Sequence, residues 1–122
     1  MIGRIALLMS PSANLSARSL KVNRWNIPQW LELEVRGRDT ACIYCGVQFG
    51  SVDGHGSRLS WEHIVNDARI ITRENIALCC RSCNSSKGAR VLADWVASPY
   101  CKRRGISLET VAEIAKKALL RE

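Results

Sequence analysis

Apolar residues recur at helical spacing along the last third of the chain, after Gly88. The spacing predicts two helices there. The first is expected to end at Ser98-Pro99, because a residue before proline avoids the helical conformation. The second is expected to begin with Ser107 as its N-cap. The first apolar face consists of Val91, Leu92, Trp95 and Val96, and the second of Leu108, Val111, Ile114, Ala115, Ala118 and Leu119.

The middle of the chain carries two strand patterns instead. Residues 58–65 contain Leu59, Trp61 and the β-branched pair Ile64 and Val65, which favours a strand. A polar loop over 66–75 leads to a short apolar run at 76–78, which predicts a second strand, and a short helix is expected over 81–85. An earlier helix is predicted over 28–36, since proline fits the first helical turn and a glycine follows the last.

These elements fit one α+β domain over residues 26–122, after a lead-in segment over residues 1–25. The chain has 122 residues and is 47% hydrophobic, which suits a single globular domain. It contains no run of the roughly 18 apolar residues that a membrane span needs. The apolar stretch near the N-terminus is shorter than the core of a secretory signal, so a cytoplasmic protein with no membrane partner is expected. Oligomeric state is not predicted.

Net charge is the first pointer to a partner. Eighteen basic and 11 acidic side chains give +7 at neutral pH. Such an excess favours a polyanion, because binding neutralises phosphates and releases their counterions. Charge alone is equally compatible with a basic protein that has no nucleic-acid role.

The cysteines are more informative. Cys42 with Cys45, and Cys80 with Cys83, form two C-x-x-C pairs. Two intervening residues let both thiolates of a pair reach one ion, and two pairs complete the tetrahedral set of a structural zinc site. A thiol-redox pair is the alternative. Of the two remaining cysteines, Cys79 is expected to be a small core residue.

Further motifs lie between and beside these pairs. Cys-Ile-Tyr-Cys-Gly is followed by Glu-His-Ile and then by Asn-Ile-Ala-Leu-Cys-Cys-Arg-Ser-Cys-Asn-Ser-Ser-Lys-Gly. In this order the motifs resemble the zinc-containing branch of the HNH endonucleases, over about residues 42–88. The resemblance implies a ββα-metal (His-Me finger) core, in which a hairpin is followed by a helix. It also implies cleavage of DNA phosphodiester bonds with one divalent cation.

Candidate catalytic residues follow from the chemistry and from the resemblance. His63 can act as general base, because an imidazole exchanges protons near neutral pH. Glu62 and Asn84 offer the oxygen ligands that Mg²⁺ or Mn²⁺ prefers. Asn75 corresponds to the family residue that holds the loop and orients the histidine. Glu62 stands where aspartate is usual, and Asn84 where a histidine often stands, which leaves the preferred ion open.

Basic residues near these motifs are candidate nucleic-acid contacts. They are Lys87, Arg81, Lys102, Arg103 and Arg104. Because no series of aromatic residues alternates with the basic residues, duplex or branched DNA is a better prediction than single-stranded DNA. The same residues could simply be solvated, and Glu62 could be a surface carboxylate. The main alternative for the whole chain is a non-catalytic zinc module that binds nucleic acid or a protein.

Overall fold

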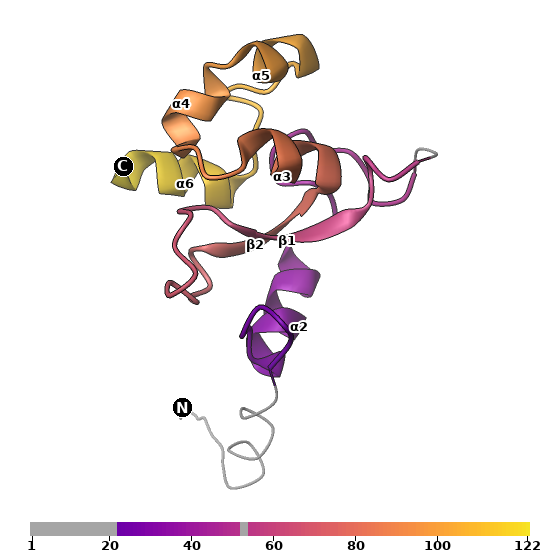
Figure 1. Cartoon of the computed structure of the whole chain (residues 1–122), viewed down its shortest axis with the longest axis vertical. Helices are drawn as coiled ribbons and strands as arrows, with labels where there is room; N and C mark the ends of the chain where they lie inside the picture. The colour runs from indigo at the N-terminus through magenta and orange to yellow at the C-terminus, as the bar shows by residue number, and fades with distance from the viewer. Residues whose placement is uncertain (1–21, 52–53) are drawn as a thin grey trace, which may run out of the picture. The chain divides into compact units, whose positions relative to one another are not determined.

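A computed structural model describes residues 22–51 and 54–122, so most of the predicted lead-in segment lies outside the described residues. The chain divides into two units, with the boundary between residues 34 and 35. No helix among the described residues is long and apolar enough to cross a membrane. The elements are α2 (Gln29–Arg38), β1 (Leu59–His63), β2 (Ile76–Cys80), α3 (Arg81–Lys87), α4 (Leu92–Val96), α5 (Pro99–Arg104) and α6 (Glu113–Arg121) (Figure 1).

In the first unit, the described residues form a turn that leads into α2. The side-chain oxygen of Asn23 accepts hydrogen bonds from the backbone nitrogens of Trp25 at 2.8 Å and Ile27 at 3.1 Å. Such an Asx-type arrangement closes a turn without help from distant residues. The predicted helix is confirmed, and it extends past the expected glycine stop to Arg38.

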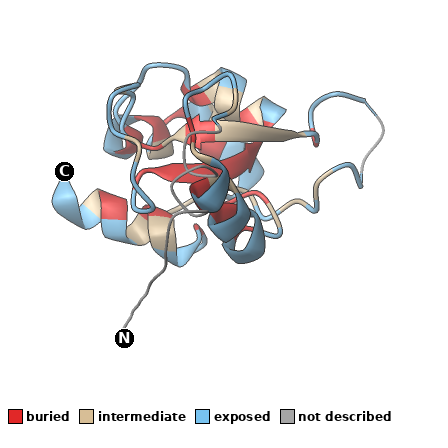
Figure 2. Cartoon of the chain, turned by 90° about the horizontal axis from the view of Figure 1, so that it is seen from below, coloured by how far each residue is buried: buried red, intermediate tan, exposed pale blue. Residues whose placement is uncertain are grey.

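The second unit is built on a hairpin with a helix attached. β1 and β2 pair antiparallel, from Leu59 opposite Cys80 to His63 opposite Ile76. All of β2 is buried, as its apolar sequence requires, and α3 follows it directly and packs on the hairpin (Figures 1 and 2). The predicted α+β fold with a ββα core is therefore confirmed.

The C-terminal helices complete the core of this unit. The buried ring of Trp95 in α4 packs edge-on against Tyr44, with 4.9 Å between ring centroids. Its indole nitrogen donates a hydrogen bond to Ser86 Oγ at 2.9 Å. The backbone nitrogen of Ala112, just before α6, donates to the carbonyl of Ile43 at 2.8 Å. These bonds fasten α4 and α6 to the α3 and Cys42–Cys45 regions.

One of the two boundary predictions at this end of the chain is confirmed and the other is wrong. As predicted, the helix before Ser98-Pro99 ends there, since α4 stops at Val96; these two residues also start a new helix, because Ser98 Oγ accepts a hydrogen bond from Cys101 N and Pro99 begins α5. Ser107 does not cap the last helix, because it closes a local turn with Thr110 and α6 begins only at Glu113. Leu108 therefore leaves the core face and is 53% exposed.

Candidate functional site

The four C-x-x-C cysteines lie together in one cluster. Their Sγ atoms are all within 4.8 Å of one another, and Cys45 Sγ lies 3.8 Å from Cys80 Sγ. Zinc–sulfur bonds of about 2.3 Å put the corners of a tetrahedron about 3.8 Å apart. The cluster thus has the donor type and the spacing to bind Zn²⁺. Four sulfur ligands leave no open position, so such an ion would be structural.

Local turns arrange the sulfur atoms. The backbone nitrogens of Cys45 and Cys83 each donate to the first sulfur of their own pair, at 3.5 Å. Hydrogen bonding with Cys42, and then with Cys83, lowers the pKa of the Cys80 thiol, while hydrogen bonding with Cys42 and Cys80 raises the pKa of the Cys83 thiol. A lowered thiol pKa favours the thiolate that a metal needs.

Helix α5 reaches two of these sulfurs. Tyr100 Oη donates to Cys83 Sγ at 3.5 Å, and Arg104 Nη2 donates to Cys45 Sγ at 3.5 Å. Arg104 Nη1 also donates to Tyr100 Oη at 2.7 Å. The sequence did not predict that either residue lies near the cysteine cluster. Tyr100 is an aromatic residue two positions after a helix cap, and that pattern alone does not indicate a contact with a metal site. Donors of this kind offset the negative charge of thiolate ligands.

Replacing Arg104 with glutamine should therefore weaken zinc binding about tenfold, the lower end of the range for residues that support metal ligands. A colorimetric chelator competition on the zinc-loaded protein measures this. Arg103→Gln removes the same charge from the exposed neighbouring position and is the matched control. Equal zinc affinity in both variants would contradict a role for the Arg104 contact.

His63 is the last residue of β1, so the strand ends where the predicted base stands. Its Nε2 is buried and has no hydrogen-bond partner among the described residues. Burial lowers the pKa of His63, and the positive charge of Lys87 lowers it further against the opposing effect of Asp67. A neutral imidazole with an unused ring nitrogen can accept a proton.

Asn75 holds the loop that joins the strands. Its side-chain oxygen accepts from Val65 N at 2.7 Å, and its nitrogen donates to the carbonyls of Val65 and Ile70, each at 3.1 Å. Its own carbonyl accepts from Ile64 N at 2.9 Å. These bonds fix the backbone directly after His63, and among the described residues no hydrogen bond joins the Asn75 side chain to the His63 ring.

Glu62 is buried, with 4% of its surface exposed, rather than a surface carboxylate. Its Oε2 accepts a hydrogen bond from Tyr44 Oη at 2.5 Å and lies 3.2 Å from the ammonium nitrogen of Lys87. Burial raises the pKa of Glu62, while Lys87 and Tyr44 lower it in part. Burial and then the charge of Glu62 raise the pKa of Tyr44 well above its ordinary value, which keeps the hydroxyl proton available for this bond.

Lys87 is fully buried against Glu62, so its ammonium is turned inward rather than toward solvent. One helical turn before it, Asn84 Nδ2 donates to Ser60 Oγ at 3.0 Å and to the Trp61 carbonyl at 2.9 Å. Asn84 Oδ1 and Glu62 Oε1 make no hydrogen bond with the described residues. The hairpin and α3 therefore bring both predicted oxygen donors and Lys87 to one side of β1.

The other predicted nucleic-acid contacts are spread over two helices. Arg81 is exposed at the start of α3, and Lys102 and Arg103 are exposed on α5. Tyr44, which entered the sequence analysis only as part of a motif, donates a hydrogen bond to Glu62. Its position between Cys42 and Cys45 could have predicted this contact, because that turn lies beside the hairpin. Ile43 N donates a hydrogen bond to the Leu78 carbonyl at 3.2 Å and holds the turn there.

A comparison with protein families agrees with this geometry. Residues 42–90 match the family model described as HNH endonuclease. This part of the chain is similar to an HNH endonuclease domain, and it contains the four clustered cysteines. No curated protein matches the chain. The family suggests nucleic acid as the partner.

Proposed function

We propose that this domain hydrolyses phosphodiester bonds of DNA, with His63 as the general base. The observation that carries the proposal is the buried, unbonded Nε2 of His63 at the end of β1, within the segment that matches the HNH family. The net charge of +7 supports a polyanionic substrate.

In this proposal, Nε2 of neutral His63 removes a proton from the attacking water, which requires the ring to turn its buried Nε2 toward the substrate first. The lowered pKa keeps the ring neutral at physiological pH, which is the form a base requires. Asn75 acts as a positioning residue, because its three side-chain hydrogen bonds hold the backbone of residues 65–70 beside the histidine.

The oxygen donors suit a hard divalent cation such as Mg²⁺ or Mn²⁺. Glu62 Oε1 and Asn84 Oδ1 are the two donor atoms that remain unbonded among the described residues, and carboxylate and amide oxygens are typical ligands of these ions. When bound, the cation would supply Lewis-acid stabilisation of the phosphate charge. The Lys87 ammonium beside Glu62 Oε2 opposes a second positive charge, so we expect weak ion binding in the absence of DNA.

Lys87 has a second part in the proposal. An ammonium group can contact a phosphate oxygen, but Lys87 is buried against Glu62. A cation that ligates Glu62 would compensate its charge and free Lys87 to turn toward the substrate. Ion binding and phosphate contact would then be linked through one carboxylate.

Nicking of supercoiled plasmid in Mg²⁺, Mn²⁺ or EDTA tests the function. We expect nicked circles to accumulate with either ion, and at least a 100-fold lower rate in EDTA, because hydrolysis loses the cation's stabilisation of transition-state charge. The cysteine-bound metal must be followed in parallel, so that loss of fold in EDTA is not mistaken for loss of catalysis. Nicking in EDTA at the Mg²⁺ rate would contradict the proposed cation.

A non-catalytic zinc module is the second candidate, and the Glu62–Lys87 ion pair is the observation that favours it. A carboxylate already neutralised by an internal ammonium has less need of a metal ion. This candidate predicts DNA or protein binding without nicking in any of the three conditions, by a folded and zinc-loaded protein.

A further inference from the structure

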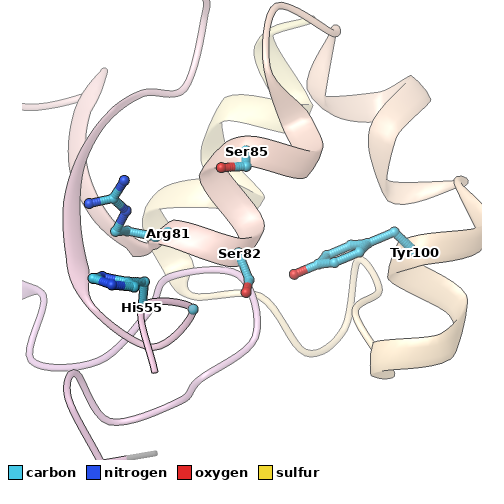
Figure 3. A pocket seen from close by; sticks show the side chains of 6 residues that line it. His55, Arg81, Ser82, Ser85 and Tyr100 are labelled. Carbon is cyan, nitrogen blue, oxygen red and sulfur yellow. The ribbon is translucent and has the colours of Figure 1, made fainter. Parts of the chain in front are cut away.

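A polar hollow lies next to the cysteine cluster, since one of its lining residues, Tyr100, donates a hydrogen bond to Cys83 Sγ. It has a volume of about 410 Å³ and is lined by His55, Gly56, Arg81, Ser82, Ser85 and Tyr100. In Figure 3, Arg81 and His55 lie at one side of the hollow, and the Tyr100 hydroxyl points toward Ser82 from the other side. The residues come from the loop before β1, from α3 and from α5.

The backbone around the hollow is held in place by hydrogen bonds. Ser82 N donates to the Gly56 carbonyl at 3.0 Å, and Arg81 N donates to the Arg58 carbonyl at 2.9 Å. Within the loop, Arg58 N donates to the His55 carbonyl at 3.1 Å. These bonds fasten the loop to the first turn of α3, so the hollow does not have to form on binding.

The side chains that line the hollow suit an anion. The lining set contains the guanidinium of Arg81, an imidazole and three hydroxyls, and no carboxylate. The hydroxyls of Ser82 and Ser85 make no hydrogen bond with the described residues, so both are available to donate. Guanidinium and hydroxyl groups are the usual donors to phosphate oxygens in protein–DNA contacts.

We propose that this hollow binds a backbone phosphate of the nucleic acid, at a position separate from the bond that is cut. The second half of this statement rests on the proposed function. The hollow is lined by residues just before β1, while His63 ends that strand. The four residue steps of β1 span about 13 Å, a length that about four nucleotides cover at about 3.4 Å of rise each.

Gly56 allows a test that leaves charge unchanged. A Cβ atom at this position would lie 2.6 Å from Ser82 Oγ, so alanine would push the hydroxyl aside and narrow the hollow. Gly37 is the matched control, because a Cβ atom there meets nothing within 4 Å and its φ is not positive. For Arg81→Gln the control is Lys117→Gln, an exposed lysine on α6 that does not line the hollow.

The experiment measures binding of a short fluorescein-labelled DNA duplex by anisotropy, at several salt concentrations and without divalent cations, so that no cutting is required. Arg81→Gln should lower the slope of log K against log salt by about one, as for one lost phosphate contact. Gly56→Ala should keep the slope and weaken binding about 2- to 10-fold, as for one or two lost hydrogen bonds. Ser85→Ala, at an exposed position that tolerates substitution, should weaken it at the lower end of that range.

The controls should bind like the unchanged protein, and zinc content and melting temperature confirm that each variant is folded. Unchanged duplex affinity in folded Gly56→Ala and Ser85→Ala would overturn the proposal. Equal effects of Arg81→Gln and Lys117→Gln would also overturn it, because general electrostatics would then suffice. If inorganic phosphate binds the unchanged protein but not Gly56→Ala, and both bind the duplex equally, the hollow is a site for free phosphate instead.

If the variants lose duplex affinity but the unchanged protein never nicks DNA, the phosphate site is supported and the nuclease function is rejected.

Discussion

Replacing His63 with alanine should lower the rate of plasmid nicking by about 10²- to 10⁴-fold, the usual contribution of a general base. The variant removes the only imidazole in the HNH-matched segment apart from His55, which lies in the loop before β1. Because Nε2 of His63 has no hydrogen-bond partner among the described residues, no buried bond is lost with it. The rate of conversion from supercoiled to nicked plasmid is the measurement.

This result is informative only if the His63→Ala variant is folded. His63→Ala should retain zinc and bind the labelled duplex with the affinity of the unchanged protein in EDTA-free, Mg²⁺-free buffer, since it alters proton transfer rather than binding. Lys117→Gln, on α6, serves as a variant that should nick normally. A folded His63→Ala protein that nicks at the original rate would reject His63 as the base.

We expect the cysteine cluster to hold a structural zinc ion, so chelation should unfold the second unit. Structural zinc contributes about 10–16 kcal/mol in small zinc domains, which is comparable with the whole stability of about 5–15 kcal/mol of a typical protein. Chelation, or Cys42→Ser, should therefore abolish the cooperative thermal transition. Circular dichroism during heating, with zinc measured in the same samples, tests this expectation.

Cys101→Ser is the matched control, because Cys101 is also buried but lies outside the cluster. It should keep its zinc and a cooperative transition, with a lower melting temperature from placing a hydroxyl in an apolar site. A chelated protein that melts at the unchanged temperature would show that the cluster does not hold a structural ion. Reversible oxidation of Cys42 with Cys45 would then support the redox alternative.

The parts of the site that sequence could predict are local. A C-x-x-C pair places its two sulfurs by one turn of backbone, and the first sulfur of each pair accepts a bond from the second cysteine's nitrogen. The hairpin and α3 followed from apolar runs and from the family resemblance. Lengths were less predictable: β1 is shorter than the apolar pattern, since the strand gives way at His63 to a loop held by Asn75.

The parts that sequence could not predict depend on distant partners. Glu62 and Lys87 are 25 positions apart, and only the packing of α3 on the hairpin brings their charges to 3.2 Å. Ser98-Pro99 fits either a stop or a start, since serine caps a helix as well as proline begins one. The start of α6 was misplaced because Ala112 N is taken by the Ile43 carbonyl, a contact that no local pattern reveals.

The contact of α4 with the first cysteine turn has a consequence for defining the minimal protein. The recognisable signature stops at residue 90, yet Trp95 fills the space beside Tyr44 and Arg104 reaches a sulfur of the cluster. A fragment cut at the edge of the signature would expose the side of Tyr44 that Trp95 covers and lose a donor to Cys45. The segment needed for a stable fold is therefore expected to extend beyond the segment that matches the family, at least to Arg104.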